Sequence, residues 1–182
     1  MAQALLIIDI QNDYFPGGAM ELSGSLAAGR KAEELLGAFR ARDLPIIHIQ
    51  HLNTRPGSTF FLPGTPGAEI HPCVAPTEGE PIFTKHFPNG FRDTPLLPYL
   101  KENGITALII AGMMTHMCVD TTVRAAFDLG LSCTLAHDAC ATRDLVFAEQ
   151  RVAAEQVQTA YLAALGSLFA EVVTAGDIIA RL

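Results

Sequence analysis

Short, wholly apolar runs separated by helical patterns constrain the fold of this chain more than any other feature. Two of them, Ala4–Ile8 (ALLII) and Ala107–Gly112 (ALIIAG), contain no polar side chain, and the first is followed at once by Asp9. Unbroken apolar runs of this length are typical of strands covered on both faces, as in parallel sheets. Four more extended runs complete the set, at residues 45–50, 81–84, 132–136 and 171–173.

Helical patterns lie between most of these runs, at residues 26–42, 94–103, 115–130 and 153–166. The sequence from Thr174 to Asp177 (TAGD) is a capping-box-like start for a last helix. Strands that alternate with helices predict an open parallel sheet. The fold class that follows is α/β, a three-layer, doubly wound sheet of six parallel strands with helices on both faces and a Rossmann-like strand order. We expect residues 1–182 to form a single domain.

Charge and hydropathy narrow the class of partner. The formal net charge is −7 and the 12 basic residues form no run, which argues against nucleic acid or an anionic membrane. No apolar run approaches the ~20 residues that span a bilayer, and the sequence MAQALLIID lacks the pattern of a signal peptide. We therefore expect a cytoplasmic protein that binds a small-molecule substrate.

The four cysteines lie far apart, and no C-x-x-C pair indicates a zinc site or a disulfide framework. Cys118 stands out because it follows the strand at 107–112 in the first turn of a helix whose predicted N-cap is Thr115. A thiol among unpaired N–H groups at the positive end of a helix dipole is favoured as thiolate. The alternative is a small buried core residue. The same alternative applies to the cysteines whose roles stay open: Cys73, Cys133 and Cys140.

Three reactive side chains are predicted to meet at one edge of the sheet. Ligands of doubly wound sheets bind beyond the carboxyl ends of the strands. The first strand ends at Asp9, the third at Lys85, and the fourth leads into Cys118. A lysine that ends an apolar strand needs a carboxylate partner, and Asp9 is the obvious one. Taken singly, Asp9 could cap a turn and Lys85 could form a structural ion pair, but together with a thiol they indicate a nucleophile site.

Three segments surround these residues: Asp9-Ile-Gln11-Asn-Asp13-Tyr-Phe15, Lys85 with Asn89-Gly-Phe91 behind it, and Gly112-Met-Met-Thr115-His-Met-Cys118-Val. They resemble the signature segments of the isochorismatase-like cysteine hydrolases, a family that includes nicotinamidases and N-carbamoylsarcosine amidase. The resemblance implies a catalytic triad of Asp9, Lys85 and Cys118. It also implies a cis peptide bond between Met113 and Met114, with the N–H groups of Met114 and Cys118 forming an oxyanion hole.

The function implied is cleavage of a C–N bond in a small amide, urea or N-carbamoyl compound, through a thioester on Cys118. We expect Asp9 to take the thiol proton and Lys85 to orient Asp9, with no cofactor. The resemblance further implies a homodimer or homotetramer. Two alternatives stay open: a vinyl ether hydrolase of the isochorismatase type, and a non-hydrolytic member with a redox-sensitive Cys118. A nucleotide-binding oxidoreductase is disfavoured because no G-x-G-x-x-G follows the first strand.

Loops above the same edge carry candidates for the substrate pocket. Phe15, Phe60 and Phe91 could line it, although core packing suits each equally well. His116 is expected at the pocket wall or at the surface. We expect no metal, because the Asp-x-His of metal-binding relatives is missing where this chain reads His48-Ile-Gln-His51. Composition does not reveal which substrate the loops select.

Overall fold

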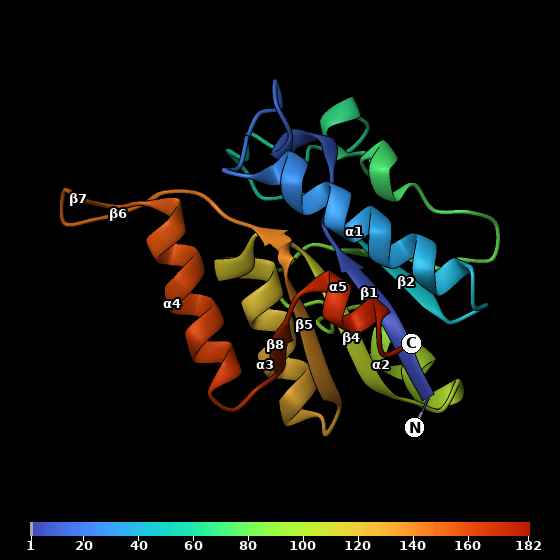
Figure 1. Cartoon of the computed structure of the whole chain (residues 1–182). Helices are drawn as coiled ribbons and strands as arrows, with labels where there is room; N and C mark the ends of the chain where they lie inside the picture. The colour runs from blue at the N-terminus through green and yellow to red at the C-terminus, as the bar shows by residue number, and fades with distance from the viewer. Residues whose placement is uncertain (1) are drawn as a thin grey trace.

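A six-stranded parallel sheet forms the centre of the computed structural model, which describes residues 2–182 (Figure 1). Its strand order, β3-β2-β1-β4-β5-β8, confirms the predicted fold class and Rossmann-like order. The strands are β1 (Ala2–Ile8), β2 (Ile46–His51), β3 (Ile82–Lys85), β4 (Ile105–Met113), β5 (Ser132–Ala141) and β8 (Glu171–Val173). The order reverses where β1 and β4 lie side by side, which is where doubly wound sheets bind ligands.

Helices cover both faces of the sheet, and β1 shows how its residues are divided between them. Leu5 and Ile7 pack in the core beneath α1 and α5, whereas Leu6 and Ile8 pack in the core beneath α2, α3 and α4. Burial on both faces is why the strand is an unbroken apolar run. Figure 1 shows α1 and α5 crossing in front of the sheet. The helices are α1 (Ser25–Arg40), α2 (Leu96–Glu102), α3 (Asp120–Asp128), α4 (Ala154–Gly166) and α5 (Ala175–Ile179).

The turn that carries Cys118 differs from the prediction. Thr115–Val119 form one π-helical turn, η4, and α3 begins only at Asp120. The prediction of Thr115 as N-cap is wrong, because the extended residue before the turn is Met114 and the Thr115 hydroxyl donates instead to the Ala141 carbonyl at 3.2 Å. Single π turns are frequent at functional sites.

Other segments are more structured than the sequence pattern predicts. Three short 3₁₀ turns hold the loops: η1 (Asn12–Tyr14), η2 (Pro66–Ala68) and η3 (Pro72–Val74). Strand β5 runs on to Ala141, past the predicted end at Ala136. A hairpin of β6 (Leu145–Phe147) and β7 (Gln150–Val152), which the pattern did not predict, projects from the body before α4 (Figure 1).

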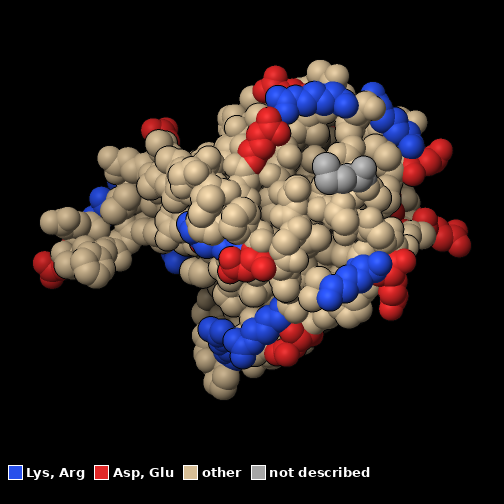
Figure 2. Space-filling view, turned by 90° about the horizontal axis from the view of Figure 1, so that it is seen from below, with Lys and Arg blue, Asp and Glu red and all other residues tan. Residues whose placement is uncertain are grey.

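The distribution of charge on the surface agrees with the low content of basic residues. On the face seen in Figure 2, Lys and Arg side chains lie next to Asp and Glu and do not gather into one basic area. Among residues 2–182, no helix has both the length and the apolar character that crossing a bilayer requires.

Candidate active site

The ammonium group of Lys85 joins three other side chains beyond the carboxyl ends of the strands. Its Nζ lies 2.6 Å from Asp9 Oδ2, 2.8 Å from His51 Nδ1 and 3.2 Å from Cys118 Sγ. All four side chains are buried, and those of Asp9 and Lys85 are fully so. An ammonium has three N–H donors, so these contacts use its whole capacity. The structure thus brings Asp9, Lys85 and Cys118 together, and it adds His51.

Backbone geometry places these side chains. Asp9 directly follows β1 and has φ 51°, a left-handed conformation that aspartate adopts more readily than most residues. On the next strand, β4 approaches β1 so closely that a Cβ on Gly112 would lie 2.3 Å from the Ile8 carbonyl oxygen. Only glycine allows this approach beside Asp9. The parallel register pairs His51 of β2 with Lys85 of β3, which explains why their side chains meet.

Two polar residues of the first loop hold the end of β2 and the long loop after it against the site. The Gln11 amide accepts from the His51 N–H at 2.8 Å and donates to the His51 carbonyl at 2.9 Å. The Asp13 carboxylate accepts from the N–H groups of Ala19 and Phe61, at 3.1 and 2.6 Å. Both side chains are buried. The segment after β1 therefore supplies the carboxylate of Asp9 and also holds the surrounding walls of the site in place.

Burial and the Lys85 charge set the protonation of the pair. Burial raises the pKa of Asp9 above its ordinary value of 3.8, and the nearby ammonium offsets this only in part. Burial opposes the charged form of Lys85, but attraction to the Asp9 carboxylate, with hydrogen bonds to Asp9 and Cys118, outweighs it and raises the pKa of Lys85. The cationic lysine is therefore held in place, while the carboxylate has become a stronger base than a free aspartate.

At Cys118, burial outweighs the helix-start effect that favours a thiolate. Burial raises the pKa of the Cys118 thiol, the Asp9 carboxylate raises it further, and the Lys85 ammonium compensates only partly. Cys118 therefore rests as a neutral thiol next to a base. Asp9 Oδ1 is buried and has no hydrogen-bond partner among the described residues, which leaves it free to accept a proton.

A cavity of about 270 Å³ opens onto this cluster. Cys118, Met114 and His51 lie at its wall, and Phe60 also lines it, as do residues that the sequence analysis missed: Tyr14, Met20, Asn53, Arg55, Ser58, His86, Pro88, Met117 and Arg143. Their loops carry no periodic pattern that would have marked them. His51 could have been found, because it ends the strand that pairs with the Lys85 strand.

Three residues that were candidates for the pocket do not line this cavity. Phe15 stacks on His71, with ring centroids 3.5 Å apart. Phe91 packs against the core under α2 and α3. His116 is buried, its Nδ1 is bonded to the Thr142 hydroxyl, and its ring meets the edge of Tyr161. Among these four candidates, only Phe60 faces the cavity.

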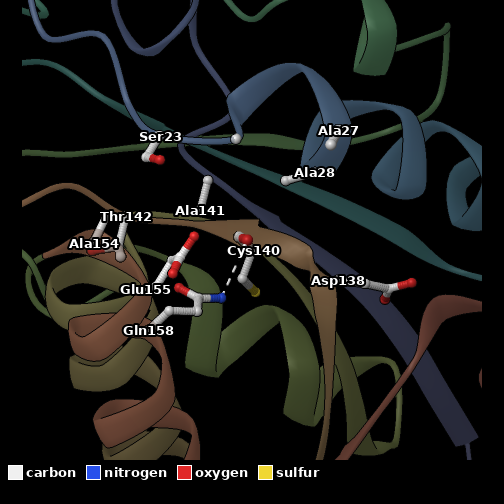
Figure 3. Close-up of a pocket in the computed structure, with 11 residues that line it drawn as sticks. Ser23, Ala27, Ala28, Asp138, Cys140, Ala141, Thr142, Ala154, Glu155 and Gln158 are labelled. Carbon is white, nitrogen blue, oxygen red and sulfur yellow. Dashed lines mark hydrogen bonds between the residues drawn. The ribbon is translucent and has the colours of Figure 1, made fainter.

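A second cavity, of about 310 Å³, lies between the starts of α1 and α4 and contains Cys140 (Figure 3). Figure 3 shows the Gln158 amide directed at the Cys140 carbonyl, 3.3 Å away. The Cys140 thiol donates to the Ala136 carbonyl at 3.3 Å, and burial raises its pKa to about 12. No base is bonded to this sulfur among the described residues, so the cavity at Cys118 is the better candidate for nucleophilic chemistry.

Atoms that could ligate a metal are held by other groups. A carboxylate oxygen of Asp9, a ring nitrogen of His51 and Cys118 Sγ lie within 4.8 Å of one another. The Lys85 ammonium contacts all three residues, so a cation would compete with it. Elsewhere, His48 Nε2 bonds Glu80 at 2.9 Å.

A doubly wound parallel sheet with a buried acid, lysine and thiol beyond its carboxyl edge defines an isochorismatase-like class of hydrolase. The chain belongs to the isochorismatase family, because the profile of the isochorismatase domain matches residues 3–177. The cis peptide bond between Met113 and Met114, expected from the resemblance, is present.

Three relatives show how far the similarity extends. The uncharacterized isochorismatase family protein YddQ of Bacillus subtilis is 45% identical over 174 residues, which are 96% of this chain and 97% of that protein. A crystal structure of an isochorismatase-family protein from Oleispira antarctica matches with a TM-score of 0.94 at 48% identity, covering 98% of this chain and 96% of that one. The nicotinamidase/pyrazinamidase of Mycobacterium tuberculosis is 29% identical over 180 residues, covering 87% of this chain and 95% of that protein.

Proposed function

We propose that this single domain is a cysteine amidohydrolase that cleaves the C–N bond of a small amide, urea or N-carbamoyl compound. The observation that carries the proposal is the Lys85 ammonium, which contacts both Asp9 and Cys118 beside a cavity that Cys118 lines. Similarity to a nicotinamidase/pyrazinamidase supports an amide as substrate. A vinyl ether reaction needs no thiol, so the position of Cys118 favours the thioester route.

In the proposed first half-reaction, Asp9 accepts the thiol proton as Cys118 Sγ attacks the substrate carbonyl carbon. Burial favours this transfer because it makes Asp9 more basic than a free carboxylate. The backbone N–H groups of Met114 and Cys118, two residues that line the cavity, hold the oxyanion that develops. When the C–N bond breaks, Asp9 returns the proton to the leaving nitrogen and a thioester remains.

In the second half-reaction, a water molecule attacks the thioester carbonyl carbon through its oxygen, and Asp9 takes a proton from this water. The C–S bond breaks, the proton returns to sulfur, and the carboxylic or carbamic acid leaves. Lys85 stays an ammonium throughout and balances the negative charge that passes between Asp9, the oxyanion and Cys118.

Loss of the Cys118 sulfur tests this proposal. We expect Cys118→Ala to lower ammonia release from a panel of carboxamides, ureas and N-carbamoyl compounds by at least about 10³-fold, because the covalent route is removed. With a slow substrate, intact-protein mass spectrometry should show an acyl adduct on the native enzyme, and peptide analysis should place it on Cys118.

The matched control is Cys140→Ala, which removes the cysteine of the other cavity. It should retain both turnover and the adduct. Full activity in Cys118→Ala would refute the mechanism. No turnover of any panel member by the native protein, together with reversible oxidation of Cys118, would instead favour the redox-sensing alternative.

A further inference from the structure

Each polar side chain that lines the cavity can donate a hydrogen bond. The Tyr14 hydroxyl and the Asn53 amide make no side-chain hydrogen bond to any described residue. His51 Nδ1 accepts from Lys85, so the hydrogen of a neutral ring is on Nε2. Asp and Glu are absent from the described residues that line the cavity. The wall therefore suits a ligand that is rich in acceptor oxygens.

Two arginines, Arg55 and Arg143, lie at the exposed mouth of the same cavity. Neither forms an ion pair with a described carboxylate, although five other arginines do: Arg40, Arg92, Arg124, Arg151 and Arg181. The carboxylate nearest to Arg143 in sequence, Asp144, already accepts from Arg151 and from the Ala154 N–H. In a chain of net charge −7, the mouth of this cavity thus carries two positive charges that form no ion pair with a described carboxylate.

Both charges act on the residues inside the cavity. The Arg143 charge opposes the burial that raises the pKa of Tyr14. The Arg55 charge adds to the burial and to the Lys85 charge that together lower the pKa of His51 to about 3. The positive potential at the mouth therefore extends to the wall beside Cys118.

We propose that the cavity selects substrates in which the scissile amide or carbamoyl group is joined to an anionic group such as a carboxylate. Arg143 and Arg55 bind that group at the mouth while Cys118 faces the C–N bond. The volume of about 270 Å³ limits the substrate to a small molecule. This inference rests on the proposed function, because it names the class of substrate for the same site.

Turnover of matched amides tests the selection. Glutaramate and pentanamide share a five-carbon chain and differ in having a carboxylate or a methyl group at the far end; 3-ureidopropionate and propylurea form a second such pair. We expect kcat/KM for ammonia release to favour the anionic member of at least one pair by about fivefold or more, as one screened ion pair allows. Raising the salt from about 0.02 M to about 0.5 M should reduce that preference.

Substitution of the arginines tests the assignment. The ratio of kcat/KM for the anionic substrate to kcat/KM for its neutral partner should fall towards 1 in Arg143→Gln. It should fall further in the double variant that also carries Arg55→Gln, and the change should lie mainly in the KM of the anionic substrate. The matched control is Arg30→Gln, an arginine of α1 that also lacks an ion pair but lies outside the cavity. The ratio should not change in this control.

Alkylation of Cys118 gives a readout that does not need turnover. Iodoacetate is anionic and iodoacetamide is neutral, and both form a C–S bond as iodide leaves and the thiol proton is released. Peptide mass spectrometry gives the rate of Cys118 alkylation by each reagent. The rate with iodoacetate divided by the rate with iodoacetamide should be about fivefold higher in the native protein than in the double arginine variant. Cys73, which is half-buried and outside the cavity, is the internal reference.

Each outcome decides the inference. Equal turnover of anionic and neutral members, or an alkylation ratio that is the same in the native protein and the double variant, would overturn anion recognition. Absence of turnover with every pair, but with a charge-dependent alkylation ratio, would refute the proposed hydrolysis and keep the anion site.

Discussion

His51 shows how the surrounding cluster sets the protonation of a single residue. Burial, and then the positive charge of Lys85, lower the pKa of His51 to about 3. The ring is therefore neutral at ordinary pH, and its Nδ1 can accept the hydrogen bond from the Lys85 ammonium. A buried ammonium needs three acceptors, and His51 supplies the one that takes no part in the proposed proton transfer.

We predict that His51→Ala lowers kcat/KM for ammonia release by about tenfold, because the Lys85 ammonium loses an acceptor and is held less firmly against Asp9. The measurement is steady-state kinetics with the best substrate of the panel, together with thermal unfolding to show that the variant is folded. His71→Ala is the control, because His71 bonds Cys73 and lies outside the cavity. Unchanged kinetics in His51→Ala would contradict the role given to this ring.

At the scale of elements, a second polar cluster anchors the strand that carries Lys85. Glu80, which precedes β3, accepts hydrogen bonds from Arg40 of α1 at 2.7 Å and from His48 of β2 at 2.9 Å. Its carboxylate also accepts from the Thr77 N–H and hydroxyl. Burial alone would raise the pKa of Glu80, but these partners outweigh it and lower the pKa to about 2. The cluster ties the start of β3 to a helix and to its neighbouring strand.

We predict that Glu80→Gln lowers the free energy of unfolding, and that the effect depends on pH. A carboxyl group with a lowered pKa stabilises the fold fully above its unfolded pKa of 4.5, and this contribution is lost as the pH falls towards about 2. Denaturant unfolding at several pH values should therefore show a constant difference between native and variant protein above about pH 4.5, and this difference should shrink as the pH falls from there towards about 2. Glu33→Gln, at an exposed position of α1 without an ion pair, should show no such trend.

Sequence patterns predicted the elements well and the site only in part. All six sheet strands were predicted. The pattern is clearest in the inner strands, whose side chains are buried on both faces of the sheet, as Leu5 and Leu6 of β1 are. The edge where Asp9 and Lys85 meet followed from the strand ends. The π turn around Cys118 and the arginines at the cavity mouth could not be predicted, since a single extra residue in a helix and an irregular loop leave no period in the sequence.

At the scale of the whole molecule, the β6–β7 hairpin exposes apolar side chains to solvent. Val146 is 72% and Phe147 82% exposed, and Figure 2 shows a largely uncharged arm standing away from the body. Large apolar side chains so exposed on a projecting arm are typical of contacts between proteins. The association into dimers or tetramers expected from the resemblance stays a prediction, and this arm is its best candidate contact.

We predict that Phe147→Ser weakens self-association, because the contact loses its largest apolar side chain. Analytical ultracentrifugation over a range of concentrations should show an assembly of the native chain and a shift of the variant towards monomer. Leu168→Ser changes another exposed apolar residue, 64% exposed and away from the arm, and should not shift the equilibrium. A native protein that sediments as a monomer at all concentrations would refute the prediction.

The lysine of the site comes from β3, which is four residues long and occupies the outer position of the sheet. Its contact with Asp9 spans 76 positions of the chain. An outer strand has one neighbour, so it can detach while the inner strands stay paired. On gentle warming, the reaction at Cys118 would then stop before circular dichroism records any loss of secondary structure. Activity would therefore report on the detachment of β3, at one edge of the sheet, before the rest of the molecule unfolds.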